Sequence, residues 1–548
     1  MGVGRHQTTI LYSWDLYEKE TDILGTPFAP WPGTAGRRQT RRPKAWATKG
    51  LHREQRGLAK APSHSTRCAP SGTLASEGRR RSPSYVEARA RPATPYAGGW
   101  RSRTLGPHEI FGLETARPQA ESLTLGLFFT ILFVFALYIR PQEWVELLLN
   151  SPVIDFTAAG AIGFVFLEGS FNKQKFVRSP INRNLAIFWV WLAITTAATG
   201  YIGGFTSTLQ TFGRVAILYY LIVLTVTNFQ QLKLLLWCLI LLSTFLSIEA
   251  VIQFYTGYSL VGATALERHM GDQAVAQARG IGIFSDPNDL ALHVVPMLAF
   301  LLPAFHKRNL SGTVITGVLL LIPLVTGVVY TRSRGGILAM AFVVWIYLRH
   351  RVGLTFSVVG LVMLFGLLMA IPRFDTTGSG SGTAQSRLDH WAYGLEEFKQ
   401  HPVFGMGWRC FTEQGYRHTA HNSFVLVLAE TGLVGAMLWI SFFYIAGKHI
   451  FAMQRITRGP PWLEPMSKAL EGAVGGWMVA GFFLSQAYGF ILYMLFAIVV
   501  ATVNVLGNLG IDVSVKWTKK DLRNVFFITA GMIVIIHLMC SLLFVAAI

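Results

Sequence analysis

The chain has 548 residues, of which 52% are hydrophobic and only 14% are charged. A soluble core of this size cannot bury so much apolar surface, so the composition excludes a soluble multidomain protein and indicates a membrane protein. The four cysteines are far apart and form neither a CxxC pair nor a Cys/His metal pattern. We therefore expect neither a disulfide framework nor a zinc site.

Residues 1–121 form a basic tail. The first 120 residues hold 20 Lys and Arg against 9 Asp and Glu, which is more than half of the net charge of +19. Arg, Pro, Gly, Ser and Thr dominate the tail and no periodic apolar positions occur, so we predict that it is disordered. Such a tail could hold anionic lipid or nucleic acid, but we favour the interpretation that it has no role, and we expect no nucleic-acid partner.

Residues 122–548 are a succession of apolar stretches, each of about 17 to 25 residues and long enough to cross a membrane. They predict an all-α fold, a polytopic transmembrane helix bundle of about twelve or thirteen spans. The predicted spans lie near 122–139, 152–168, 184–202, 213–229, 234–254, 289–305, 312–330, 335–348, 353–371, 422–446, 469–487, 488–506 and 525–546.

The basic residues of the loops predict the orientation of the bundle. If the tail is cytoplasmic, the alternate loops on the same side carry most of the Lys and Arg, as the positive-inside rule requires. The two long loops, near 255–288 and 372–421, then face outward. The loop at 372–421 is the larger.

The type of cation differs between the two sides. The inward loops hold nine Lys and eight Arg, whereas the outward loops hold ten Arg and one Lys. Arg presents a planar fork of donors that matches phosphate, and a coding bias toward Arg would act on both sides alike. The bias therefore indicates an anionic ligand at the outer surface, such as a lipid diphosphate. The outward arginines are Arg140, Arg214, Arg268, Arg279, Arg332, Arg334, Arg373, Arg387, Arg409 and Arg417.

Two segments place arginines next to predicted helix starts. Asp286 and Pro287 are typical of a helix start, where Asp caps the helix and Pro takes its first position, and Arg279 lies on the approach to it. A helix N-terminus at the outer interface favours anions. Arg332 and Arg334 lie in a tight outward turn between two apolar spans, where they must pair with something or reach the interface.

The larger outward loop contains a predicted interfacial helix. Its apolar positions are Leu388, Trp391, Leu395 and Phe398, which follow helical spacing. The loop ends at His421, where a new span begins. Loops of this length are usually functional.

The segment from His421 to Gly435 resembles the O-antigen ligase superfamily. It has the pattern of that superfamily: a His followed by Asn, and then two glycines at Gly432 and Gly435. The Arg279 segment, the turn at Arg334 and the order of the spans and the large loop are also similar. One difference is Ile283, where the Arg-x3-Leu pattern has Leu.

The resemblance implies transfer of a glycan from an undecaprenyl diphosphate carrier to an acceptor at the outer face of a bacterial inner membrane, with no metal or other cofactor. The catalytic residues are then His421, as the base or orienting group, and Arg334 and Arg279, which stabilise the diphosphate leaving group. The expected partners are the lipid-linked donor, membrane lipid, and an acceptor that is a lipid A core, a glycan chain or a protein. The expected substrate-binding residues are Arg332, Arg387, Arg214, Asn422 and Asn288.

Several alternatives remain open at this point. An O-antigen polymerase or a protein O-oligosaccharyltransferase shares the donor and the orientation of the ligase. A transporter or flippase is a further alternative, although it predicts inverted repeats and polar residues near the bilayer midplane. Glu430 lies on the opposite helix face from His421, so we interpret it as a buried polar contact within the bundle and not as a partner base. We interpret Gly432 and Gly435 as positions that allow helices to approach closely.

Overall fold

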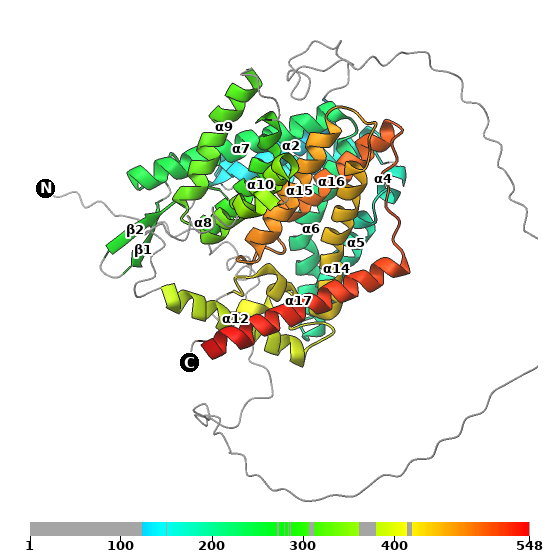
Figure 1. Cartoon of the computed structure of the whole chain (residues 1–548). Helices are drawn as coiled ribbons and strands as arrows, with labels where there is room; N and C mark the ends of the chain where they lie inside the picture. The colour runs from blue at the N-terminus through cyan, green and yellow to red at the C-terminus, as the bar shows by residue number, and fades with distance from the viewer. Residues whose placement is uncertain are drawn as a thin grey trace, which may run out of the picture. The chain divides into compact units, whose positions relative to one another are not determined.

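The structure of the chain is a computed structural model (Figure 1). It describes residues 123–149, 151–171, 173–262, 264–270, 273–278, 280–282, 284, 286–305, 312–353, 355–360, 380–413 and 419–546. The tail at 1–121, much of the predicted span at 353–371 and both 372–379 and 414–418 of the large loop lie outside the described residues, as does Arg279.

The described residues are almost entirely helical, which confirms the predicted fold class. The longer helices are α2 (Leu125–Ile139), α3 (Val153–Leu167), α5 (Pro180–Ala198), α6 (Gly203–Thr225), α7 (Phe229–Thr256), α8 (Pro287–Leu301), α9 (Gly312–Tyr330), α10 (Arg334–Val352), α12 (Gly380–Gln400), α14 (Ser423–Gln454), α15 (Leu463–Gly481), α16 (Phe490–Asn508) and α17 (Lys519–Ala546). The shorter ones are α4 (Lys173–Val177), α13 (Cys410–Glu413) and the 3₁₀ turns η2 (Pro141–Glu143), η3 (Glu146–Leu148) and η4 (Leu302–Phe305).

A small hairpin interrupts the helices in the first long outward loop. Strands β1 (Leu266–Met270) and β2 (Gln273–Gln277) pair antiparallel, with Leu266 opposite Gln277. Hydropathy did not predict this hairpin.

Among the described helices, six are long and apolar enough to cross a membrane: α6, α7, α8 with η4, α14, α16 and α17. Shorter apolar helices lie at Leu125–Ile139, Val153–Leu167 and Val314–Tyr330. Helices α5, α10 and α15 have 19 residues each, which corresponds to about 28 Å. The polytopic membrane character is thus confirmed, whereas the number of twelve or thirteen spans stays a prediction.

Two predicted span boundaries are wrong. Helix α6 begins at Gly203 and not near residue 213, because its first two turns are rich in Gly, Ser and Thr and lower the local hydropathy. Helix α15 ends at Gly481 and not at 487, because the apolar residues Phe482, Phe483 and Leu484 continue the hydropathy beyond the helix. Residues 482–489 form a loop, which we call the α15–α16 loop.

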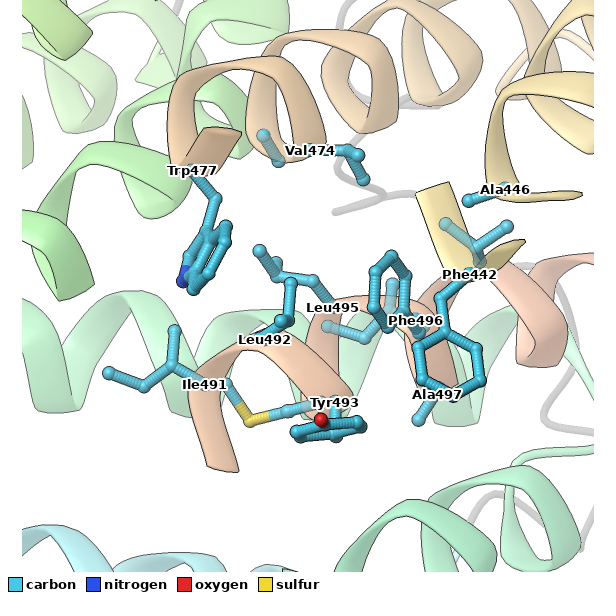
Figure 2. Close-up of a cluster of buried hydrophobic side chains, with 14 of the residues drawn as sticks. Phe442, Ala446, Val474, Trp477, Ile491, Leu492, Tyr493, Leu495, Phe496 and Ala497 are labelled. Atoms are coloured by element: carbon cyan, nitrogen blue, oxygen red, sulfur yellow. The ribbon is translucent and has the colours of Figure 1, made fainter. Parts of the chain in front are cut away.

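The centre of the bundle is apolar and lies around α16 (Figure 2). The Phe496 ring of α16 lies 5.7 Å from the Phe442 ring of α14, and Trp477 of α15 is fully buried nearby. Van der Waals contact drives such packing between helices in lipid, and a small residue lets two helices approach. At Gly476 of α15, an added Cβ would lie 2.6 Å from Val343 of α10.

Two ion pairs join neighbouring helices on one side of the bundle. Lys448 near the end of α14 bonds to Asp521 at the start of α17, and Arg349 near the end of α10 pairs with Glu471 in α15. We call this side the inward end. The outward end contains the starts of α8, α10 and α14 and the α15–α16 loop.

Candidate functional site

His421 lies directly before α14 in a strained position. Its φ of 47° is rare for a residue with a side chain, and its N–H donates to Thr419 Oγ1 at 3.3 Å. The next residue, Asn422, is fully buried, and its Oδ1 accepts from the N–H groups of Phe424 at 2.9 Å and Val425 at 3.2 Å. Asn422 is therefore the N-cap of α14, and it fixes the backbone that carries His421.

A second histidine, His390 of α12, lies beside His421. The two ring centroids are 5.7 Å apart, and the His390 side chain is only 5% exposed. His390 lies within the predicted interfacial helix, but it was not predicted to belong to the site. Its position three residues after Arg387 was the available signal, because residues at this spacing share a helix face.

Helix α12 confirms that the predicted segment of the large loop is helical, whereas its position at a membrane interface stays a prediction. Trp391 and Leu395 are buried, and Leu388 and Phe398 pack against the core. Trp391 also contacts the α15–α16 loop, since its ring lies 5.3 Å from the ring of Phe482. Figure 1 shows α12 beside α17, with which it is in contact.

The α15–α16 loop makes hydrogen bonds to both α14 and α8. Ser423 Oγ donates to the Leu484 carbonyl at 2.5 Å and accepts from the Gln486 N–H at 3.0 Å. The side chain of Gln486 donates from Nε2 to Asp289 Oδ1 in the first turn of α8, at 2.8 Å. A further hydrogen bond links the hydroxyl of Thr419 to that of Ser485. Ser423, Ser485 and Gln486 were not predicted to belong to the site because they lie within predicted spans, and Thr419 was not predicted either.

The start of α8 confirms the predicted cap. Asp286 Oδ1 accepts from the N–H of Asn288 at 2.7 Å and from its Nδ2 at 2.8 Å, and Pro287 occupies the first helical position. The side chain of Asn288 is thus bonded to the cap. Its predicted role in binding substrate stays a prediction.

The residues that flank Arg279 contact α7 and α9. Ala278 donates its N–H to the Tyr330 carbonyl at 3.3 Å, and Gly280 donates its N–H to Gln253 Oε1 at 3.1 Å. Both flanking residues are therefore at the outward end, close to the turn that carries Arg332. Because Arg279 lies outside the described residues, its role stays a prediction.

The turn between α9 and α10 places Arg334 at the first position of α10. Ser333 caps this helix by accepting the N–H of Gly336 at 3.1 Å, and Arg334 is exposed. Arg332 has a φ of 53°, and its guanidinium lies 5.3 Å from the Phe254 ring. The turn therefore directs one arginine to solvent and the other along an aromatic face.

Two glycines bring the start of α10 against the rest of the site. A Cβ added at Gly336 would lie 2.5 Å from Ala291 of α8, and one added at Gly335 would lie 2.9 Å from Phe483 of the α15–α16 loop. The starts of α8, α10 and α14 therefore meet around one loop. Three helix N-termini that meet make a favourable place for an anion, because each carries a partial positive charge.

The two remaining predicted arginines differ in placement. Arg387 is partly exposed on α12, one turn before His390, and so belongs to the same outward end. Arg214 is exposed but lies eleven residues into α6, about 16 Å from its outward start. Helix α6 packs against α2, α3, α5 and α16. The expectation that Arg214 lies at the outward end followed from the wrong start of that span.

Glu430 and Gly432 shape the loop beneath the site. Glu430 is 2% exposed, and its Oε1 accepts from the Phe411 N–H at 3.3 Å, which agrees with its interpretation as a buried polar contact. Gly432 was interpreted as a close-packing position. Its φ of 64° and ψ of −168° instead break α14, and a Cβ there would lie 2.2 Å from the Val403 carbonyl oxygen.

Part of the chain is similar to a known protein family. Residues 318–440 match the family model described as O-Antigen ligase. The matched segment runs from α9 through α10 and α12 into α14, so it contains Arg332, Arg334, Arg387 and His421. No curated protein matches the chain.

Proposed function

We propose that the chain belongs to the O-antigen ligase and polymerase family and transfers a glycan from undecaprenyl diphosphate to an acceptor hydroxyl. The match of residues 318–440 supports this proposal. Members of this family are glycan-transferring enzymes that use lipid-linked donors. The finer proposal is that the chain is a ligase in a bacterial inner membrane, with the acceptor, a lipid A core or a similar glycan, at the periplasmic face.

One observation carries this proposal. The starts of α8, α10 and α14 meet around the α15–α16 loop, with Arg334 at one of these starts and His421 directly before another. A diphosphate is doubly suited to this place, because helix N-termini and guanidinium groups both favour phosphate oxygens. His421 lies within the same group of elements. The acceptor hydroxyl would bind at this place to reach the glycan.

The proposed reaction is a single displacement at the anomeric carbon of the glycan. The acceptor oxygen forms a bond to that carbon, while the bond from the carbon to the diphosphate oxygen breaks. The bonding electron pair leaves with undecaprenyl diphosphate, and Arg334 and Arg279 stabilise its growing charge. The hydroxyl proton passes to an imidazole nitrogen of His421.

In this proposal His390 and Asn422 are positioning residues. Asn422 fixes the backbone of His421 through the cap of α14, and His390 lies against the His421 ring. Arg332 and Arg387 bind the donor from the turn before α10 and from α12. Asn288 and Arg214 are weaker proposals, since Asn288 is bonded to Asp286 and Arg214 lies far along α6.

The test is reconstitution of the full chain in liposomes with a defined undecaprenyl diphosphate glycan. Separate reactions receive a lipid A core, a free glycan chain or a protein as the acceptor. Transfer to the lipid A core alone would support the ligase, and transfer to glycan or protein would identify a polymerase or a protein transferase. If none of these acceptors leads to consumption of the donor, the proposed function is wrong.

A further inference from the structure

Three aromatic rings lie together at the outward ends of α7 and α9. Phe254 and Tyr255 are near the end of α7, and Tyr330 is the last residue of α9. The centroid of the Tyr330 ring lies 4.5 Å from that of Phe254 and 5.3 Å from that of Tyr255, and the two tyrosine hydroxyls form a hydrogen bond. We call these three rings the aromatic platform. Tyr255 is 68% exposed, so a ligand can reach the platform from outside.

The chain after α7 folds back along the last turns of this helix. Glu249 Oε2 accepts the N–H of Leu260 at 3.0 Å, and Leu260 is exposed. Exposed backbone that is not helical does not occur in the hydrocarbon core of a bilayer, because its polar groups would lack partners there. The core therefore ends near the level of Glu249. Tyr255 lies six residues farther along the helix, which is about 9 Å beyond this level.

Lipid tails therefore do not cover the platform. Tyr258 and Leu260, in the segment after α7, are exposed as well. Apolar surface that clusters outside the hydrocarbon core is typical of a binding site. Sugar rings suit this surface, because a pyranose presents C–H groups on its face and hydroxyls at its edge. Tyrosine matches both, since its ring is apolar and its hydroxyl forms hydrogen bonds.

The platform is continuous with the turn that carries the outward arginines. The guanidinium carbon of Arg332 lies 5.3 Å from the centroid of the Phe254 ring. Tyr330 precedes Arg334 by four residues, so the Cα atoms of these two residues are at most about 14 Å apart. A donor whose diphosphate binds at this turn can therefore extend its glycan to the platform.

The arginines also decide which glycan the platform would meet. Arg332 and Arg334 are proposed to bind the diphosphate of the donor, whereas the acceptor is proposed to bind beside His421. The sugar that is bonded to the diphosphate reacts at the site itself. The platform is therefore available to the sugars of the donor that follow the first one.

We propose that the aromatic platform binds the glycan of the lipid-linked donor, with a sugar beyond the first one stacked on Tyr255. This inference rests on the proposed function, because it assigns the diphosphate to the neighbouring arginines. It makes Tyr255 a specificity-determining residue, which favours donors that carry a longer glycan over donors that carry one sugar.

The test compares two donors in the liposome assay. One is undecaprenyl diphosphate with a single N-acetylglucosamine, and the other carries a chain of four N-acetylglucosamines. We expect Tyr255→Ala to raise KM for the four-sugar donor about fivefold, because one aromatic contact contributes about that factor. KM for the one-sugar donor and KM for the acceptor should stay as in the wild type.

Two further variants are controls. Tyr255→Phe keeps the ring and loses only the hydroxyl, so its KM for the four-sugar donor should stay close to that of the wild type. Tyr201→Ala removes another exposed tyrosine, which lies between α5 and α6, and should change neither donor KM. An equal rise of KM for both donors in Tyr255→Ala, or the same rise in Tyr201→Ala, would overturn the proposal.

Direct binding separates this inference from the proposed function. Saturation-transfer NMR detects binding of the free four-sugar chain to the purified full chain in detergent, and it needs no glycan transfer. We expect signals from the C–H protons of the sugar with the wild type and their loss with Tyr255→Ala. If these signals appear but no donor is consumed, the platform stands and only the proposed reaction is wrong.

Two results of the binding experiment would contradict the platform. The first is the absence of sugar signals with the wild type, whatever the transfer assay gives. The second is an unchanged sugar signal in Tyr255→Ala together with weaker retention of phosphatidylglycerol in native mass spectrometry, which would identify the rings as a contact for lipid headgroups.

Discussion

The two ends of the bundle are built from different interactions. At the inward end, cationic and acidic side chains bond to each other, as in the contacts of Lys448 with Asp521 and of Arg349 with Glu471. At the outward end, caps and single hydrogen bonds connect the elements, with the Asp289 carboxylate as one acceptor, and arginines lie at or beside the helix starts. Ser333 and Asn422 cap helices, and Gln486 connects α8 to the loop that holds α14.

This difference separates stability from function. Ion pairs at the inward end hold helices together, and the two charges of each pair neutralise each other. The neutral caps Ser333 and Asn422 position the starts of α10 and α14 without adding a negative charge there, whereas Asp286 and Asp289 bring carboxylates to the start of α8. We therefore expect matched substitutions at the two ends to have opposite effects on glycan transfer and on unfolding.

The largest effect is expected for His421→Ala. Loss of a proton acceptor should reduce glycan transfer at least about 100-fold, with normal expression and helix content. The matched control is His401→Ala, because His401 is exposed in the same large loop and should be replaceable. Rates are measured in the liposome assay. Normal transfer by His421→Ala would remove this residue from the mechanism.

Arg334→Lys keeps the charge but loses the planar fork of donors. We expect a loss of about tenfold or more in kcat, because lysine cannot bind a diphosphate through two parallel hydrogen bonds. Arg349→Lys, near the other end of the same helix, is the control and should leave kcat unchanged. Full activity of Arg334→Lys would count against bidentate phosphate recognition.

Gln486→Leu removes the amide that links the α15–α16 loop to α8, while the side chain keeps a similar size. Asp289 then loses its hydrogen-bond donor at 2.8 Å. We expect the rate of glycan transfer to fall about tenfold, because α8 and α14 are no longer held in their relative positions. The control is Gln454→Leu, which removes a similar bond of 2.9 Å to Glu471 at the inward end. Equal rates in the two variants would show that the bond does not position the site.

Lys448→Ala tests the inward end. Asp521, which is largely buried, loses its bond to Lys448, and we expect the free energy of unfolding to fall by about 1–2 kcal/mol. Glycan transfer at a temperature below unfolding should stay normal. Thermal unfolding in detergent measures the first effect and the liposome assay the second. A loss of transfer in folded protein would contradict the separation of the two ends.

The smallest effect is expected for deletion of residues 2–118. The composition of this tail predicts no packed structure, so its removal should change neither the rate of transfer nor the unfolding temperature. Both quantities are compared with those of the full chain. A loss of activity would show that the basic tail contributes to function.

Much of the fold and part of the site could be predicted from sequence. The apolar stretches predicted the helical bundle, and Asp286 and Pro287 predicted the start of α8. The apolar positions from Leu388 to Phe398 predicted the buried face of α12. These features depend on neighbouring residues in the chain. Local chemistry decides them, so a single sequence is sufficient.

Other features could not be predicted because they depend on tertiary contacts. Ser423, Ser485 and Gln486 act through bonds across more than sixty residues, and hydropathy placed all three within predicted spans. The break at Gly432 exists because the chain near Val403 takes over hydrogen bonds that a regular helix would make for itself. Nothing near Gly432 in the chain distinguishes this from close helix packing.

The break in α14 makes one transmembrane helix depend on a segment outside it. The carbonyl oxygens of Ala429 and Glu430 accept from the N–H groups of Met406 and Gly407, and the N–H of Leu433 donates to Pro402. These exchanges replace bonds that would otherwise run along the helix axis. A residue inserted between 402 and 407 would therefore disrupt α14 around Gly432, even though the insertion itself lies in the loop that precedes the helix.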